Sequence, residues 1–137
     1  MAYPIHASCQ CGGVSYKLLA APTMVVACHC KACQTLSTNA FSVTAMVKSN
    51  TIEFSGEMKE WSRPADSGNV SVAKFCPTCG NCIYHINPKE PEVIKLKLKS
   101  NEASNSTVLQ PTTHVWVSEK QDWYTIPDDV KVFEKQS

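Results

Sequence analysis

Short runs of hydrophobic and β-branched residues alternate with polar turn clusters along almost the whole chain. Val, Ile, Phe, Tyr, Thr and Trp favour strands, and short runs of them bounded by Gly, Pro, Asn and Ser are typical of β-structure. The predicted strands are 14–19, 24–28, 41–47, 51–54, 57–61, 70–75, 82–86, 93–98 and 114–117. The pattern therefore predicts an all-β fold.

The clearest strict alternation places three aliphatic side chains on one face of a strand and three lysines on the other. The aliphatic residues are Ile94, Leu96 and Leu98, and the lysines are Lys95, Lys97 and Lys99. Successive side chains of a strand point to opposite faces, so we expect the lysines to form a solvated face. A second reading is that they meet the carboxylates of a bound ligand.

One short helix is predicted, over residues 30–37, and we expect a surface loop over 100–106 and frayed residues from Phe133 onward. A chain of 137 residues fits a single domain, which we place at 1–137 with its core at about 5–133.

Charge and composition narrow the classes of partner. Thirteen Lys and Arg face twelve Asp and Glu, for a formal charge of +1, so we expect neither nucleic acid nor a membrane surface as partner. No apolar run approaches the length of a bilayer span, and the N-terminus lacks the features of a secretory signal. We therefore expect a cytoplasmic location, where eight cysteines favour metal ligation over disulfides.

Two of the cysteine groups together supply a complete set of metal ligands. Cys9 and Cys11 stand two residues apart, which lets a strand present both thiols on one face. Cys76 and Cys79 precede Gly80 in a turn that brings two sulfurs together and aims backbone amides at them. These four thiolates match the closed geometry of a structural zinc site, which would clamp the N-terminal segment to the middle of the chain.

The middle group, Cys28, Cys30 and Cys33, offers three thiolates and no obvious fourth ligand. A second zinc held this way keeps an open position, as catalytic sites do. His29 lies between two of the ligands and should point away from them. Cys82 closes this site as a fourth ligand, is a buried inert thiol on its own strand, or has a redox or other role.

These motifs resemble the glutathione-dependent formaldehyde-activating enzyme family, also called the centromere protein V family. The resemblance covers residues 5–133 and rests on the three cysteine groups, on Val14 and Tyr16, and on His114-Val115-Trp116 with Trp123. It implies a small β-tent of antiparallel sheets pinned by zinc. It also implies structural zinc at Cys9, Cys11, Cys76 and Cys79, and catalytic zinc at Cys28, Cys30 and Cys33.

The activity implied by the resemblance is that of a carbon-sulfur lyase that joins formaldehyde and glutathione into S-hydroxymethylglutathione. Three hypotheses stay open: this reaction, a related zinc enzyme using another thiol or aldehyde, and a non-catalytic zinc-stabilised interaction module. The expected partners are a small-molecule thiol and aldehyde, with a homo-oligomer also open. Trp61, Trp116 and Trp123 are expected to pack in the core, with a role as pocket walls as the alternative.

Overall fold

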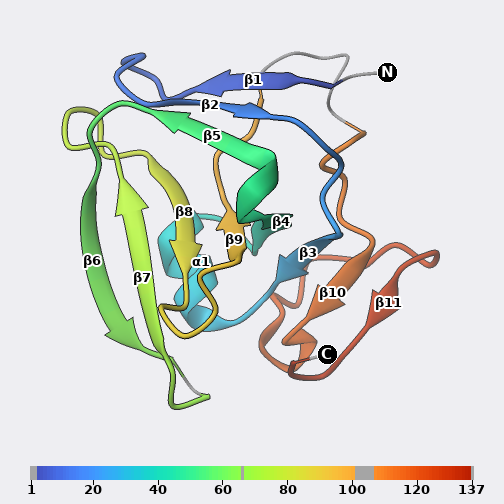
Figure 1. Ribbon diagram of the computed structural model, residues 1–137. Coiled ribbons are helices and arrows are strands. Elements are labelled where there is room, and N and C mark those ends of the chain that lie inside the picture. Colours follow the sequence, from blue (N-terminus) through green and yellow to red (C-terminus); the bar gives the residue numbers. More distant parts are fainter. Residues whose placement is uncertain (1–2, 66, 101–106, 137) are drawn as a thin grey trace.

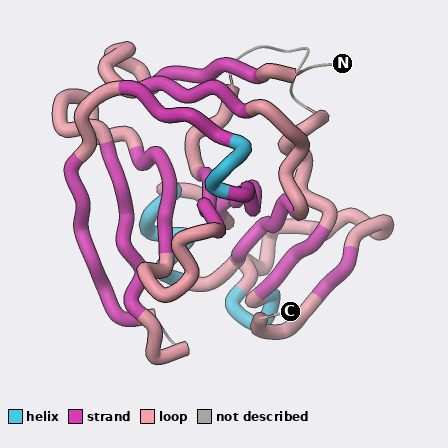
Figure 2. Tube along the Cα trace, viewed as in Figure 1, coloured by secondary structure: helices cyan, strands magenta, loops and turns pink. Residues whose placement is uncertain are grey.

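The computed structural model describes residues 3–65, 67–100 and 107–136 and is built almost entirely of strands (Figures 1 and 2). The strands are β1 (Ile5–Ser8), β2 (Ser15–Leu18), β3 (Met24–Cys28), β4 (Ser42–Lys48), β5 (Ile52–Ser55), β6 (Lys59–Pro64), β7 (Val70–Phe75), β8 (Cys82–Ile86), β9 (Val93–Leu96), β10 (Thr113–Val115) and β11 (Lys131–Val132). The helix α1 spans Lys31–Ser37, and single 3-10 turns span Ser49–Thr51 and Val117–Glu119. The all-β prediction is confirmed.

The strands form two sheets. One has three antiparallel strands in the order β1-β2-β5 and lies at the top of Figure 1. The other has eight strands in the order β11-β10-β3-β4-β9-β8-β7-β6 and curves beneath it, from β6 on the left to β11 on the right.

The large sheet departs from the expected all-antiparallel pairing at one end. β10 runs parallel to both neighbours, β3 and β11, whereas every other pair in the two sheets is antiparallel among the residues described. Parallel neighbours need a long crossover connection, and β10 reaches β3 from far along the chain. The register sets Val115 opposite Cys28, so this pairing positions the start of the middle cysteine group.

The main core fills the space between the two sheets. The small sheet contributes Ile5, Tyr16, Leu18 and Ile52, and the large sheet contributes Val25, Ala45, Val47, Ile94 and Leu96. These residues alternate along their strands with outward-facing side chains, as period-2 patterning requires. The opposite face of the large sheet therefore carries Cys28, Ser42 and Thr44, and Lys97, just after β9, reaches the two hydroxyls there.

Most predicted strands lie within one or two residues of the observed ones, and the predicted helix is confirmed as α1. The strands at 24–28, 70–75 and 82–86 match β3, β7 and β8 at both ends. The expected loop over 100–106 lies almost wholly outside the described residues.

The prediction of frayed residues from Phe133 is wrong. The backbone amides of Trp116, Val117 and Ser118 donate to the carbonyls of Lys135, Phe133 and Glu134. These hydrogen bonds tie the C-terminal segment to the end of β10.

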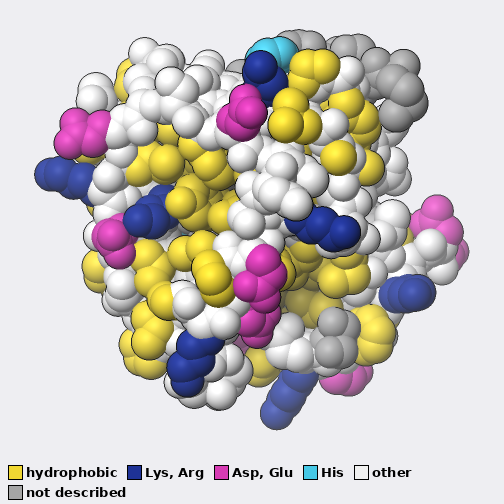
Figure 3. Space-filling view, in the orientation of Figure 1, with side chains coloured by type: hydrophobic (Ala, Val, Ile, Leu, Met, Phe, Trp, Pro, Cys, Tyr) yellow, Lys and Arg dark blue, Asp and Glu magenta, His cyan; other side chains and the backbone are white. Residues whose placement is uncertain are grey.

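On the face seen in Figure 3, basic and acidic side chains are interspersed and no broad area carries one sign of charge. This distribution agrees with the formal charge of +1. None of the described helices has the length and apolar character needed to cross a bilayer.

Candidate metal centres

Four cysteine thiols from two distant loops meet beneath one end of the small sheet. Cys9 and Cys11 follow β1, and Cys76 and Cys79 lie in the turn between β7 and β8. The sulfurs of Cys9 and Cys11 are 3.7 Å apart, and those of Cys11 and Cys76 are 3.6 Å apart. A tetrahedral zinc ion with Zn–S bonds of about 2.3 Å requires sulfurs about 3.8 Å apart, so this cluster fits such an ion.

Backbone amides supply the positive poles around this four-cysteine cluster. The amide of Val14 donates to the sulfur of Cys9 at 3.3 Å, and that of Gly13 donates to Cys11 at 3.4 Å. The amide of Cys79 lies 3.5 Å from the sulfur of Cys76. Hydrogen bonds to a thiolate favour its charged form, so the local backbone prepares the cluster for a cation.

Two glycines, Gly13 and Gly80, lie beside the four-cysteine cluster, where a side chain would crowd a sulfur or strain the turn. A Cβ on Gly13 would lie 3.3 Å from the sulfur of Cys11 and 3.9 Å from that of Cys76. Gly80 has φ +78°, and its amide donates to the carbonyl of Cys76 at 2.9 Å. The turn chemistry expected for Cys76–Gly80 is therefore present.

The second cluster is built from the end of β3 and the first turn of α1. Cys28 ends β3, Cys30 caps α1 by accepting a hydrogen bond from the amide of Cys33, and Cys33 lies on the helix itself. All three sulfurs lie within 4.8 Å of one another. No fourth His, Cys, Asp or Glu joins them within the residues that the structure describes.

The three thiols cannot all ionise without a cation. Interactions with Cys28 and Cys30, with smaller contributions from Lys97 and Ser42, lower the pKa of Cys33 to about 2. The same interactions with Cys30 and Cys33 raise the pKa of Cys28 far above its usual range. One thiolate thus forms readily at the expense of its neighbours, and a divalent cation would allow the others to lose their protons.

Cys82 lies on β8 and joins neither cluster among the described residues. It is half-buried, and burial raises the pKa of its thiol while Lys97 and Lys99 oppose that shift. Nothing in this arrangement makes Cys82 a ligand, although it shares Lys97 with the three-cysteine cluster.

His29 points away from its neighbouring cysteines into a buried aromatic cluster, as expected. Its Nε2 lies 2.8 Å from Nδ1 of His114, and its ring packs against Phe41 and Tyr124. Its Nδ1 has no hydrogen-bond partner among the described residues. The side chain of Gln34 donates to the backbone carbonyl of His29 at 2.7 Å and thereby ties α1 to this segment. His29 therefore holds the segment between Cys28 and Cys30 in place and is not part of the three-cysteine cluster.

The expected solvated lysine face is wrong for two of its three members. Nζ of Lys97 donates to the hydroxyls of Thr44 and Ser42, at 2.5 and 3.5 Å. Nζ of Lys99 donates to the carbonyls of Val43 and Lys97, at 2.7 and 2.6 Å. The predicted strand over 93–98 ends at Leu96, so Lys97 and Lys99 lie beyond it. Helix α1 contacts the neighbouring strand β4, and a single strand pattern carries no signal of that.

Ser42 is the residue near the cysteines that the sequence did not reveal. It is buried directly across from Cys28 in the β3–β4 pair, and its hydroxyl contributes to lowering the pKa of Cys33. A lone serine in a hydrophobic strand carries no signal for such a role, because the register between two strands decides it.

Two of the three tryptophans do not pack in the core as expected. Trp61 and Trp123 are 61% and 71% exposed, and Trp116 is half-buried beside Lys135. None of them lines either of the two cavities found among the described residues.

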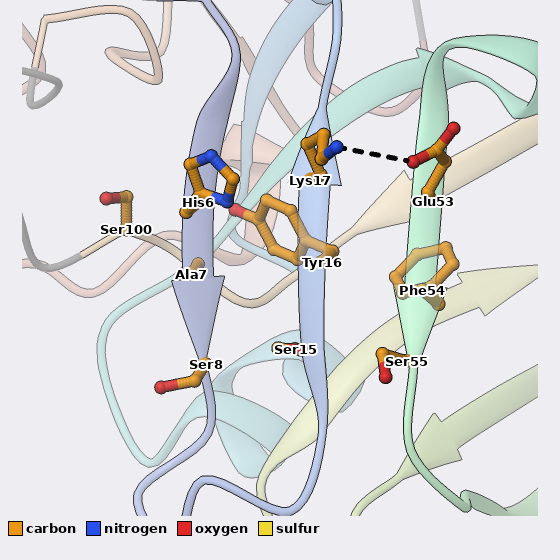
Figure 4. Close-up of a pocket in the computed structure, with 10 residues that line it drawn as sticks. All are labelled: His6, Ala7, Ser8, Ser15, Tyr16, Lys17, Glu53, Phe54, Ser55 and Ser100. Carbon is orange, nitrogen blue, oxygen red and sulfur yellow. Dashed lines mark ion pairs between the residues drawn. The ribbon is translucent and has the colours of Figure 1, made fainter.

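A cavity of about 590 Å³ opens on the small sheet, away from the cysteines. Its lining includes His6, Lys17 and Glu53, and Lys17 and Glu53 form an exposed ion pair at 3.8 Å (Figure 4). Exposed pairs of this kind contribute little to stability. No thiol lines this cavity.

Comparisons with known proteins agree with this geometry. The sequence profile of a family described as "Glutathione-dependent formaldehyde-activating enzyme" matches residues 4–119. A crystal structure of a Rhodobacter sphaeroides protein superposes with a TM-score of 0.55 and 17% identity, covering 75% of this chain and 94% of that one. At this identity the superposition shows a shared fold alone. No curated protein gives a significant match.

Proposed function

The chain belongs to the glutathione-dependent formaldehyde-activating enzyme family, and on this premise we propose that it joins formaldehyde to glutathione to form S-hydroxymethylglutathione. The observation that carries this proposal is the second cluster, in which three thiols converge and no described side chain completes the set. Such a site leaves a ligand position for a substrate.

We assign zinc ions to both clusters. Cys9, Cys11, Cys76 and Cys79 would hold the first, and Cys28, Cys30 and Cys33 the second. Thiolate sets of this kind suit zinc better than the hard cations Mg²⁺ and Ca²⁺. At the second cluster the ion would supply Lewis acidity that favours the deprotonated form of an added thiol at neutral pH.

The reaction balances without a redox partner. The thiol of glutathione loses its proton and its sulfur bonds to the carbonyl carbon of formaldehyde. The π bond of the carbonyl breaks, and its oxygen takes up one proton. The protein's part is to fix the reacting groups in place, which is worth several orders of magnitude in favourable cases.

Other residues favour the thiolate form of one ligand and hold the three-cysteine cluster in position. Ser42 and Lys97 favour the thiolate form of Cys33. The pairing of His29 with His114 holds the loop that carries Cys28 and Cys30 against β10.

Two other functions stay under test. A non-catalytic module requires a fourth protein ligand at the second cluster, for which Cys82 is the candidate. A related enzyme acting on another thiol or aldehyde would use the same open position.

The proposal is tested by measuring the exchange of glutathione with its hydroxymethyl adduct by NMR, because the two compounds also combine without a catalyst. The zinc-loaded protein should accelerate this exchange at least about tenfold over buffer. Cys30→Ser should abolish the acceleration, and Cys82→Ser, the matched control, should retain it. Exchange no faster than in buffer would refute the proposal.

A further inference from the structure

We propose that Lys97 is a positioning residue whose ammonium group provides the counter-charge for a thiolate added at the three-cysteine cluster. The inference deepens the proposed function and rests on the open second site. It concerns which kind of ligand the site prefers, and it begins from the environment of one side chain.

The ammonium of Lys97 lies against buried hydroxyls. Ser42 and Thr44, which accept its hydrogen bonds, are 4% and 5% exposed. Neither hydroxyl carries charge, and no carboxylate pairs with Lys97 within the described parts of the chain. A charge removed from water needs an opposite charge nearby to be stable.

The candidates for the opposite charge are the cysteine thiols on this face of the large sheet, where Cys28 lies across from Ser42. Burial lowers the pKa of Lys97, and Cys33, Cys82 and Cys28 are the groups that counteract this shift. Ser42, which accepts a hydrogen bond from Lys97, lies directly across from Cys28 in the β3–β4 register and contributes to lowering the pKa of Cys33. Ser42 therefore contacts the ammonium group and neighbours the start of the three-cysteine cluster.

The other basic groups on this side of the sheet do not replace Lys97. Burial, followed by Lys97, lowers the pKa of His85 to about 4, so this imidazole is neutral at physiological pH. Lys99 directs its ammonium at two backbone carbonyls. Lys95 lies two residues before Lys97 on the same face and is half-buried.

The two cysteine clusters differ in whether a lysine lies near them. Around the four-cysteine cluster the groups that shift the cysteine pKa values are backbone amides and other thiols, with no lysine among them in the described residues. Three thiolates and a divalent ion leave a net negative charge, and an added thiolate increases it. A nearby ammonium group offsets this increase and so favours binding of a thiolate. It does not favour binding of a neutral ligand.

The test uses protein loaded with Co²⁺ in both clusters, whose absorption reports a new sulfur ligand. Glutathione, 2-mercaptoethanol and imidazole are titrated into the parent protein, Lys97→Met, Lys97→Gln and Lys97→Arg, with Lys95→Met as the matched control. Lys97→Gln remains able to hydrogen-bond to Ser42 and Thr44, so it serves if the methionine variant fails to bind two ions.

We expect the neutral Lys97 variants to bind both thiols about 10- to 100-fold more weakly and imidazole within about twofold of the parent. Lys97→Arg and Lys95→Met should stay close to the parent for all three ligands. If the neutral Lys97 variants bind only glutathione more weakly, Lys97 contacts the carboxylates of that ligand, and this result would overturn the inference.

Equal thiol binding by the parent and the neutral variants would also overturn it, as would equal weakening of imidazole, which indicates structural damage. Failure of the parent to bind any thiol while it holds two Co²⁺ ions is a different result. It would refute the open site and the proposed function together.

Discussion

At the scale of single residues, the second cluster is open if Cys82 is not a metal ligand and closed if it is. Cys82 lies on β8, outside both groups of clustered sulfurs, and shares Lys97 with the three-cysteine cluster. We predict that Cys82→Ser retains two metal ions per chain, whereas Cys33→Ser retains one. Metal analysis of the purified variants measures this directly, and loss of an ion from Cys82→Ser would show that the site is closed.

Tyr16 gives a second prediction at this scale. Its side chain is buried in the core, its hydroxyl donates to the carbonyl of Leu98 at 2.8 Å, and burial raises its pKa to about 12. We expect Tyr16→Phe to lower the free energy of unfolding by about 1 kcal/mol at pH 7.

The pH dependence of that difference follows from the direction of the shift. Because the folded-state pKa lies above the unfolded value of 10.0, the neutral phenol stabilises the fold below pH 10, and this contribution is lost as pH rises toward 12. Urea unfolding of both proteins from pH 7 to 11 should show the advantage of Tyr16 shrinking above pH 10. A constant difference would contradict this account.

At the scale of elements, the end of β5 and the loop after β1 approach each other too closely for any side chain. Gly56 has φ +104°, and a Cβ there would collide with the backbone carbonyl of Gly13, beside the four-cysteine cluster. Gly56→Ala should therefore cost about 3 kcal/mol of stability and reduce metal occupancy at that cluster.

Gly68 is the matched control for that substitution. It has φ +86°, lies in the β6–β7 turn and has open space around the position of a Cβ. Gly68→Ala should cost about 1 kcal/mol, from backbone strain alone, and leave metal content unchanged. Urea unfolding and metal analysis of the two variants test the pair, and equal costs would contradict a specific role for Gly56.

The elements also show what the sequence could and could not predict. Strong strand formers with clear turns predicted β3, β7 and β8 to the residue. β1, with the sequence Ile-His-Ala-Ser, has little intrinsic preference for a strand and forms because Ile5 and Ala7 pair with β2 and pack on the core. The parallel position of β10 beside β3, and with it the placement of His114 against His29, depends on long-range topology that local patterns do not contain.

The same limit applies to the candidate sites. Cysteine spacing predicted which thiols converge, because the geometry of two-residue and turn spacings is local. The partners of those thiols are Ser42 on β4 and Lys97 just after β9, and the pairing of β3, β4 and β9 brings them together. The role of each cluster and the single-domain organisation remain predictions.

For the whole molecule, the two clusters differ in what they connect. The four-cysteine cluster joins the segment after β1 to the turn after β7, where Cys11 and Cys76 are 65 positions apart. The three-cysteine cluster lies within six consecutive residues, from the end of β3 to the first turn of α1. Structural zinc binding contributes roughly 10 kcal/mol, which is available only in the folded state. The first cluster should therefore stabilise the entire fold.

We predict that Cys9→Ser loses one metal ion and most of the global stability, several kcal/mol. Cys30→Ser should also lose one ion but keep a cooperative unfolding transition, with a smaller loss. Thermal unfolding followed by circular dichroism compares the two, with Cys82→Ser as the control. Equal destabilisation by Cys9→Ser and Cys30→Ser would contradict the division into a structural and a functional centre.

The central claim is that the second cluster is a metal site open to an external thiol. Native mass spectrometry of the freshly reduced, zinc-loaded protein, with glutathione and with its S-methyl analogue, tests it most directly. We predict two zinc ions per chain and retention of glutathione but not of the S-methyl compound, which cannot supply a thiolate. Two zinc ions with no difference between the two ligands would contradict the claim and favour a closed structural site.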